Sequence, residues 1–212
     1  MKKQVKGIVA AALLLFSFSL GARAQQNVCY GATNKIYKVD YDPTLSTAES
    51  GDGASQGSSG SVYTWTISTG FAGTINGSTV STLNGSQLNS ITVDWGTTPS
   101  GTTYTITVKE ERGGCSSTKT LTVTVNAIPS TPTITPTAPT CSSAGSSTIS
   151  NYDAALTYMF TPAGPSVGTG GAITGMTVGT SYTVTASNTN CTSASSASFS
   201  NAAQLTTPST PT

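Results

Sequence analysis

Short runs of alternating apolar and polar residues recur along most of the chain. Four runs place their apolar residues two positions apart, mostly with threonine between: Tyr63, Trp65 and Ile67; Ile91, Val93 and Trp95; Tyr104, Ile106 and Val108; Leu121, Val123 and Val125. A period of two is typical of antiparallel strands with one buried face and one face in solvent. No segment carries a helical period. The sequence therefore predicts an all-β protein.

Turn signals and weaker strand patterns extend this prediction. Asn76-Gly77 and Asn84-Gly85 are expected to form tight hairpin turns, because both central positions of a type I′ turn need a positive φ. An early strand over residues 35–41 would bring the count before residue 128 to six or seven. The remaining expected strands cover residues 147–150, 156–160, 173–176, 182–186 and 197–200.

Two repeated blocks indicate a tandem array. The pentapeptide Pro-Ser-Thr-Pro-Thr occupies residues 129–133 and returns 79 positions later at residues 208–212. The strand that contains Tyr104 returns 78 positions later around Tyr182. Two unrelated landmarks with nearly one period predict successive domains of similar fold. We expect the final pentapeptide to begin a linker into a further domain, so that the chain is a truncated piece.

The first 24 residues have the pattern of a cleaved export signal. Lysines at positions 2, 3 and 6 precede an apolar stretch from Ile8 to Leu20, and Ala22-Arg23-Ala24 fits a small-x-small cleavage site before Gln25. The apolar stretch is shorter than a comfortable membrane span, and an uncleaved anchor is the alternative. We expect an exported chain that starts at Gln25 and does not insert into a membrane after cleavage.

Composition divides the rest of the chain into two domains. Residues 25–128 hold the first expected β-sandwich, and residues 140–207 hold a smaller one. Between them, residues 129–139 contain four prolines, a spacing that favours an extended, semi-rigid linker. From Ser130 onward, 35 of 83 residues are Ser or Thr and only Asp153 is charged. A glycosylated Ser/Thr-rich stalk is therefore the alternative to the second sandwich.

The charge balance argues against nucleic acid as a partner. Without residues 1–24, the nine Lys and Arg fall to five against eight Asp and Glu, a net charge of −3. Binding to phosphate backbones or to an anionic membrane surface needs basic patches. We expect neither among the partners of this chain.

Four cysteines, Cys29, Cys115, Cys141 and Cys191, form an even number in a chain that we expect to be exported. Disulfides are the default in that setting. A metal site is disfavoured, because the chain has no histidine and no Cys-x-x-Cys spacing. Three pairings exist, and we expect Cys29–Cys115 and Cys141–Cys191, since each pair then lies within one repeat.

Few residues could carry catalysis. Without histidine the chain cannot assemble a Ser-His-Asp or Cys-His nucleophile. Asp40 and Asp42 share one face of the early strand, whereas the adjacent Glu110 and Glu111 point to opposite faces. Neither pair shows the converging carboxylates that a glycosidase needs. We expect a non-catalytic protein without a cofactor.

Two kinds of binding site are open alternatives. Asp40, Asp42 and Asp52 offer the carboxylates that Ca²⁺ prefers, but their spacing matches no EF-hand loop, and plain surface acids are the simpler interpretation. Trp65 and Trp95 have rings that stack well on sugars. Each lies in phase with apolar neighbours on its own strand, which favours packing in the core instead.

The order of these motifs resembles a known repeat family. The segments concerned are residues 63–67, 89–96, 104–108 with Gly114-Cys115, and 121–125. They look like a PKD-like, immunoglobulin-like repeat of the surface and gliding-motility adhesins of Bacteroidota-type bacteria, many of them exported by the type IX system. Residues 140–207 are similar to Ser/Thr-rich repeats of the same proteins. The chain departs from the PKD pattern after Trp65, where Thr-Ile-Ser-Thr-Gly replaces the usual acidic and glycine element.

The resemblance implies two tandem immunoglobulin-like β-sandwiches and no catalytic residues. The expected function is that of a structural or adhesive module, the N-terminal part of a multidomain adhesin-like protein. It would lie outside the cell or on the outer-membrane surface, with surface or extracellular glycans or proteins as partners. A carbohydrate- or calcium-dependent binding module and an accessory region of a secreted hydrolase are the alternatives.

Overall fold

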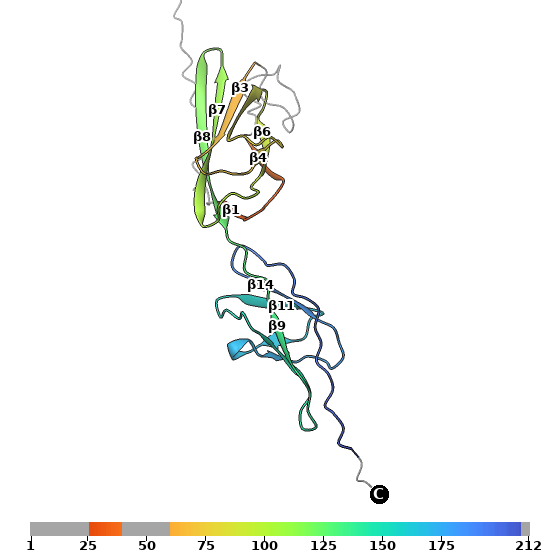
Figure 1. The fold of residues 1–212 in the computed structure, drawn as a ribbon. Helices are drawn as coiled ribbons and strands as arrows, with labels where there is room; N and C mark the ends of the chain where they lie inside the picture. The colour runs from red at the N-terminus through yellow and green to blue at the C-terminus, as the bar shows by residue number, and fades with distance from the viewer. Residues whose placement is uncertain (1–25, 40–59, 209–212) are drawn as a thin grey trace, which may run out of the picture.

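The computed structural model describes residues 26–39 and 60–208, and its regular structure is almost entirely β (Figure 1). Within these ranges the only helical element is one 3₁₀ turn, η1 (Thr169–Gly171). None of the helical structure found there is long and apolar enough to cross a membrane. The expected export signal, residues 1–24, lies outside the described residues. The strands form two sandwiches that lie end to end (Figure 1).

The first sandwich pairs a five-stranded sheet with a three-stranded sheet. The larger sheet has the order β1-β8-β7-β3-β5, with bounds Gln26–Cys29, Cys115–Asn126, Thr102–Arg112, Val62–Ile67 and Thr82–Ser86. The smaller sheet has the order β2-β6-β4, with bounds Lys35–Lys38, Ser90–Asp94 and Thr74–Ile75. All neighbouring strands are antiparallel except β1 and β8, which run parallel.

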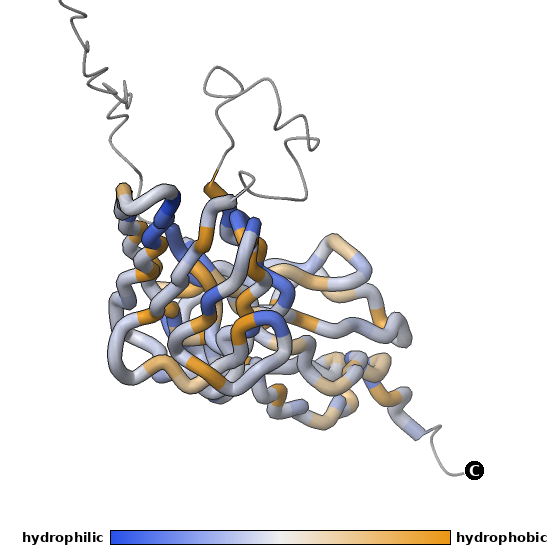
Figure 2. The backbone as a smooth tube through the Cα atoms, turned by 90° about the horizontal axis from the view of Figure 1, so that it is seen from above, coloured by the Kyte–Doolittle hydropathy of each residue, from blue (hydrophilic) through white to orange (hydrophobic). Residues whose placement is uncertain are grey.

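The alternating residues of these strands form the core, as the sequence predicts, and apolar positions recur along the strands in Figure 2. Trp95 is fully buried and packs edge-on against Tyr37 and Phe71, with ring centroids 6.5 and 5.5 Å apart. Trp65 is 2% exposed, and its indole N–H donates to the carbonyl of Leu88 at 2.7 Å. Both tryptophans are core residues, so neither offers a platform for a sugar.

One of the two expected Asn-Gly turns is correct and the other is wrong. Asn76-Gly77 has φ values of 49° and 78°, and Ile75 and Ser78 close this turn. Asn84-Gly85 instead lies inside β5, paired with β3. After β5 the chain crosses to the facing sheet instead of folding back beside β5, so a two-residue hairpin turn has no place there.

The strand order of the first sandwich is immunoglobulin-like with one difference. If β1, β2 and β3 are strands A, B and C, and β6, β7 and β8 are E, F and G, then C, F and G share one sheet while B and E share the other. The difference lies between β3 and β6. Along this chain, the first strand after β3 is β4, which pairs with β6 (strand E), and the next is β5, which pairs with β3 (strand C). In variable-type domains, the extra strands that follow strand C join the sheet that contains C.

The second sandwich has the strand order of a constant-type immunoglobulin domain. Its strands are β9 (Ile134–Thr137), β10 (Ser146–Ile149), β11 (Thr157–Thr161), β12 (Ser166–Val167), β13 (Ile173–Thr174) and β14 (Thr183–Ser187). Antiparallel pairs β9–β10 and β12–β13 are joined by a bridge between Thr148 and Ala172, giving the order β9-β10-β13-β12. Facing them are β11, β14 and residues 192–199. These are the A-B-E-D and C-F-G sheets.

The last segment of this sandwich is not a regular strand. Residues 192–199 form isolated bridges, Ser187–Thr192 and Tyr182–Phe199, instead of a continuous ladder with β14 (Thr183–Ser187). The strand expected over residues 197–200 is therefore wrong. Ser193, Ser196 and Phe199 lie opposite Ala186, Val184 and Tyr182, so the segment advances three residues for every two on the facing strand. The carbonyl groups of the segment therefore do not lie where a regular ladder would place them.

Two serine side chains compensate for this mismatch. The hydroxyl oxygen of Ser193 accepts a hydrogen bond from the backbone N–H of Ala186 at 2.9 Å, and that of Ser196 accepts one from Val184 at 3.0 Å. Both serines are buried. Buried N–H groups need a partner, and serine supplies here what a regular strand would supply through its backbone.

The range expected to be linker, residues 129–139, holds a strand. Its second half forms β9, which pairs with β10 at the edge of the sheet. Pro136 lies within β9, a position that proline tolerates on an edge strand because one side of the strand needs no ladder hydrogen bonds. The connection between the sandwiches is therefore shorter than the proline spacing suggested.

Candidate functional site

A disulfide between Cys29 and Cys191 joins the two sandwiches. The Cα atoms of these residues are 5.8 Å apart, although 162 positions separate them in the sequence. Cys115 and Cys141 are unpaired and exposed. The expected pairs, Cys29–Cys115 and Cys141–Cys191, are therefore both wrong.

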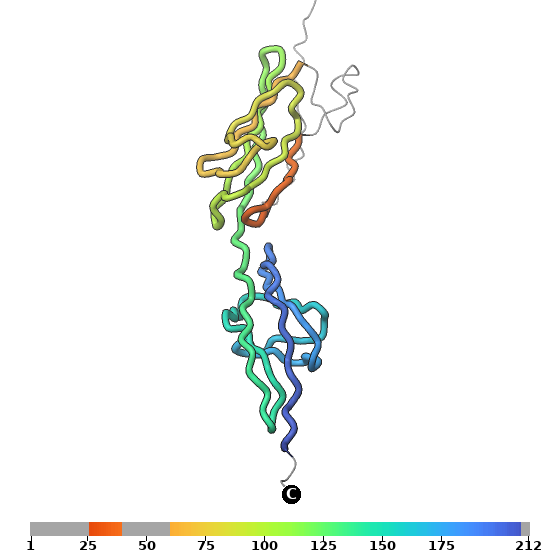
Figure 3. The backbone as a smooth tube through the Cα atoms, turned by 45° about the vertical axis from the view of Figure 1, so that its right-hand side comes forward, coloured from red at the N-terminus to blue at the C-terminus, as the bar shows by residue number. Residues whose placement is uncertain are grey.

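Strand length explains why the expected pairs do not form. Cys29 ends β1 opposite Asn126, the last residue of β8, whereas Cys115 is the first residue of β8. Because β8 has 12 residues, its ends lie roughly 36 Å apart, and a disulfide needs Cα atoms within about 7 Å. Cys141 lies in the β9–β10 connection, a segment at the end of the second sandwich away from the first sandwich (Figure 3).

Asn126 holds the junction together from the side of the first sandwich. Its side-chain N–H groups donate to the carbonyl of Val28 and to the side chain of Asn27, at 3.3 and 3.2 Å. Its side-chain oxygen accepts a hydrogen bond from the amide of Asn190 in the second sandwich at 3.2 Å. The side chain of Asn126, on β8, is thus hydrogen-bonded both to β1 and to the loop of the second sandwich that contains Asn190.

The loop of the second sandwich that reaches this junction, residues 188–191, is shaped by Asn188. Its side-chain oxygen accepts hydrogen bonds from the backbone N–H of Asn190 and of Cys191, at 2.9 and 2.7 Å. Its side-chain N–H reaches across to the carbonyl of Ala127 at 3.4 Å. This asparagine therefore both closes the turn that presents Cys191 and contacts the end of the first sandwich.

The linker is fastened to the second sandwich. Asn151 donates to the carbonyl of Thr131 at 2.9 Å and accepts from the backbone N–H of Thr133 at 2.8 Å. Pro132 is buried between these two residues. Beside the linker lies a hollow of about 300 Å³, whose walls include Pro129 and Tyr158. The segment has fixed contacts along its length, which reduces its freedom to bend.

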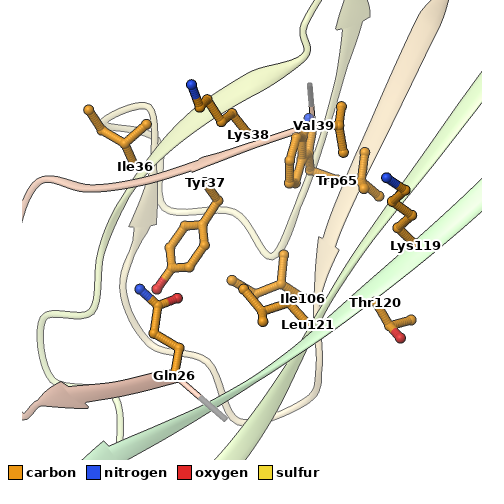
Figure 4. A pocket seen from close by; sticks show the side chains of 11 residues that line it. Gln26, Ile36, Tyr37, Lys38, Val39, Trp65, Ile106, Lys119, Thr120 and Leu121 are labelled. Atoms are coloured by element: carbon orange, nitrogen blue, oxygen red, sulfur yellow. The ribbon is translucent and has the colours of Figure 1, made fainter. Parts of the chain in front are cut away.

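A cleft of about 280 Å³ opens between β2 and β8 of the first sandwich (Figure 4). Tyr37, Trp65 and Ile106 line its inner wall, while Lys38 and Lys119 stand at its rim. Burial raises the pKa of the Tyr37 phenol, and the hydrogen bond that its oxygen accepts from the indole N–H of Trp95 opposes this shift. Among the described residues, those that line the cleft include no carboxylate.

The two glutamates singled out in the sequence, Glu110 and Glu111, have separate partners. Glu110 accepts hydrogen bonds from the hydroxyls of Ser61 and Tyr63 at 2.7 and 3.0 Å. Glu111 forms an exposed ion pair with Lys109 at 2.8 Å. Each glutamate has its own partners on the sheet, and these interactions are structural.

The calcium prediction stays untested. Asp40, Asp42 and Asp52 lie outside the described residues, so their arrangement is a prediction from sequence alone. In residues 26–39 and 60–208, no group of three or more His, Cys, Asp or Glu is placed to hold a metal ion.

No protein-family model matches this sequence, and no curated protein matches it. Among solved structures, the chain is similar to an I-band fragment of titin, I67-I69, with 11% identity and a TM-score of 0.32 over 86% of this chain. The chain spans 62% of the length of that fragment.

Two further solved structures give comparable values. The extracellular portion of mouse CD200RLa has 12% identity and a TM-score of 0.31, with 82% of this chain and 98% of that chain covered. The titin domains z1z2 in complex with telethonin have 11% identity and a TM-score of 0.29, with 88% and 93% covered. Similarities at this level carry no argument, so the immunoglobulin-like assignment rests on the strand order described above.

Proposed function

We propose that the chain is a non-catalytic, exported structural module in which two sandwiches act as a stiff spacer. It would form the N-terminal part of a multidomain cell-surface adhesin-like protein with PKD-like repeats, exported by the type IX system. The observation that carries this proposal is the Cys29–Cys191 disulfide at the junction. The motif order of the sequence supports the adhesin-like part.

The two sandwiches are connected twice. The peptide linker from Ala127 to Thr133 is one connection, and the disulfide is the second. A single connection lets two bodies swivel in every direction, whereas two separate covalent connections leave only bending about the line between them. Hydrogen bonds from Asn188 and Asn190 oppose that bending as well. A stiff junction of this kind suits a protein that must hold something at a distance from a surface.

The disulfide also supports export. Disulfides persist in oxidising compartments and are rare in the cytosol. Surface or extracellular glycans or proteins remain the proposed partners. We propose residues 25–128 as the first domain. The second domain, expected at residues 140–207, keeps its proposed end but begins earlier, at β9 (Ile134–Thr137).

Small-angle scattering tests the spacer role. The oxidised chain should fit one elongated envelope with a maximum dimension of about 80–100 Å, since each sandwich is roughly 35–40 Å long. Cys29→Ser should keep both folded sandwiches but give a broader range of shapes. Cys115→Ser/Cys141→Ser, which retains the bridge, is the matched control. A compact envelope, or equal flexibility of the oxidised chain and Cys29→Ser, would refute the proposal.

A further inference from the structure

The four cysteines lie at two kinds of position in the fold, and each sandwich has one cysteine at each kind. Cys29 is the last residue of β1 and Cys141 lies shortly after β9, the first strand of the second sandwich, and we name them the first-strand cysteines. Cys115 and Cys191 directly follow the turn that leads into the last strand or segment, and we name them the hairpin cysteines.

The two hairpin cysteines match residue for residue. Cys115 pairs with Arg112 across a two-residue turn, Gly113-Gly114, whose φ values are 55° and 81°. The carbonyl of Cys191 accepts a hydrogen bond from the N–H of Asn188 across a turn of the same length, at 3.0 Å. Each cysteine is thus the first residue after the tip of its hairpin.

In both sandwiches the C-terminal part of the chain lies beside the first-strand cysteine. In the first sandwich, the N–H of Tyr30, directly after Cys29, donates to the carbonyl of Asn126, the last residue of β8, at 2.8 Å. In the second sandwich, the side chain of Gln204 donates to the carbonyl of Cys141 at 2.7 Å, and the N–H of Leu205 donates to the carbonyl of Thr140 at 3.0 Å.

The junction that is present joins a first-strand cysteine to a hairpin cysteine of the next sandwich. The unused pair is of the same two kinds. Cys115 stands at the tip of the β7–β8 hairpin, at the outer end of the first sandwich (Figure 1). The β9–β10 connection, which contains Cys141, lies at the opposite outer end, that of the second sandwich (Figure 3). Both thiols are exposed, and they are too far apart to pair within one chain.

We propose that Cys141 of one chain forms, with Cys115 of a second copy, the same kind of disulfide that Cys29 forms with Cys191. The partner of each outer end is then the opposite outer end of another copy. Such a contact uses two different surfaces at opposite ends of an elongated chain, so copies add head to tail. The inference rests on the Cys29–Cys191 junction and not on the adhesive role.

Two thiol–disulfide exchange steps form the bond. The Cys141 thiolate attacks a small-molecule disulfide such as glutathione disulfide, which leaves a mixed disulfide and one glutathione thiolate. The Cys115 thiolate of the second copy then attacks the Cys141 sulfur and releases the second glutathione thiolate. Two protein thiols are oxidised, one glutathione disulfide is reduced to two glutathione thiols, and the two protons pass through the solvent from the protein thiols to the glutathione thiolates.

The experiment compares single variants with their mixture. The full chain is produced by export, reduced, and reoxidised with glutathione disulfide at high protein concentration. The wild type should give a ladder of linear oligomers on a non-reducing gel, with a Cys115–Cys141 peptide in the mass spectrum. Cys115→Ser and Cys141→Ser alone should each lose all species above the monomer, and their equimolar mixture should give dimers and nothing larger.

Three outcomes would overturn the proposal. One is homodimer formation by either single variant, and another is a Cys115–Cys115 or Cys141–Cys141 peptide in the wild type. The third is a wild type that stays monomeric while peptide mapping shows the Cys29–Cys191 bond formed. That bond serves as the internal control for correct oxidation. Cys115→Ser/Cys141→Ser, the control of the scattering experiment, keeps the Cys29–Cys191 bond but lacks both outer thiols, so its envelope tests the spacer role independently of head-to-tail linkage.

Discussion

At the scale of single residues, the junction depends on amide side chains more than on charge. Asn126 contacts β1, β8 and the loop of the second sandwich, and Asn188 shapes that loop. An amide can donate and accept at once, so one side chain satisfies groups on both sides of the junction. The stability of the junction should therefore respond strongly to these two residues.

Asn126→Ala should lower the free energy of unfolding by about 1–3 kcal/mol, because it leaves partly buried groups without partners. It should also speed reduction of the Cys29–Cys191 bond by dithiothreitol, since the loop next to the sulfur atoms loses its anchor. Asn27→Ala removes only one of the hydrogen bonds and is the matched control. Equal reduction rates for the two variants would show that Asn126 does not hold the loop.

Tyr37 predicts a loss of stability in alkali. Burial raises the pKa of its phenol above the ordinary value of about 10. The stabilisation that this shift provides is complete below about pH 10 and is lost as the pH rises through the raised pKa, because the unfolded state ionises first. Urea unfolding between pH 8 and 11 should show a steeper decline for wild type than for Tyr37→Phe.

A Tyr37→Phe profile that coincides with the wild-type profile would contradict the assignment of the alkaline loss to Tyr37.

At the scale of elements, residues 192–199 show how a Ser-rich segment can complete a sheet. A regular strand with one buried face buries every second residue, whereas this segment buries every third one: Ser193, Ser196 and, in part, Phe199. The serine hydroxyls bridge the gap that the mismatch leaves. The abundance of serine in the second sandwich therefore has a structural use in addition to solubility.

Ser193→Ala and Ser196→Ala should each destabilise the second sandwich by about 1–3 kcal/mol, because a buried backbone N–H of β14 loses its acceptor. Ser195→Ala, at an exposed position between them, should be nearly neutral. Thermal unfolding of the oxidised protein followed by circular dichroism distinguishes the three. Equal melting temperatures for all three variants would mean that water replaces the hydroxyls without loss.

At the scale of the whole molecule, the disulfide encloses nearly all of the described chain in one covalent loop. A pulling force on the two ends passes through Cys29 and Cys191 without loading residues 30–190 between them. The strands from β2 to β14 are then protected from forced unfolding as long as the bond is intact, whereas β1 and residues 192–199 can be pulled away.

Single-molecule stretching measures this protection. The oxidised chain held at its ends should extend only by the short segments outside the loop. Reductant should release roughly 550 Å of additional length, from 162 positions at about 3.3–3.6 Å each. Cys29→Ser should extend to the same length without reductant. Full extension of the oxidised wild type would mean that the bond does not carry the load.

The sequence by itself determined the strands and the core. The alternation around Trp65, Ile106 and Val123 is a property of near neighbours, and it correctly identified both the fold class and the buried face. The turn at Asn76-Gly77 was predictable for the same reason, because a positive φ at two adjacent residues is a local requirement. The sequence repeat also matched positions that are equivalent in the two sandwiches.

Tertiary structure alone decided which of those positions meet. The repeat placed Cys29 and Cys115 in one sandwich, but sequence proximity says nothing about their distance, which β8 sets by separating them along its full length. Cys29 instead meets Cys191, because the linker brings the hairpin of the second sandwich against the end of the first. Asn84-Gly85 lies within a strand for a similar reason, since the partner strand β3 is distant in sequence. Local backbone preference follows from neighbouring residues, whereas pairing across a junction follows from the lengths and directions of whole elements.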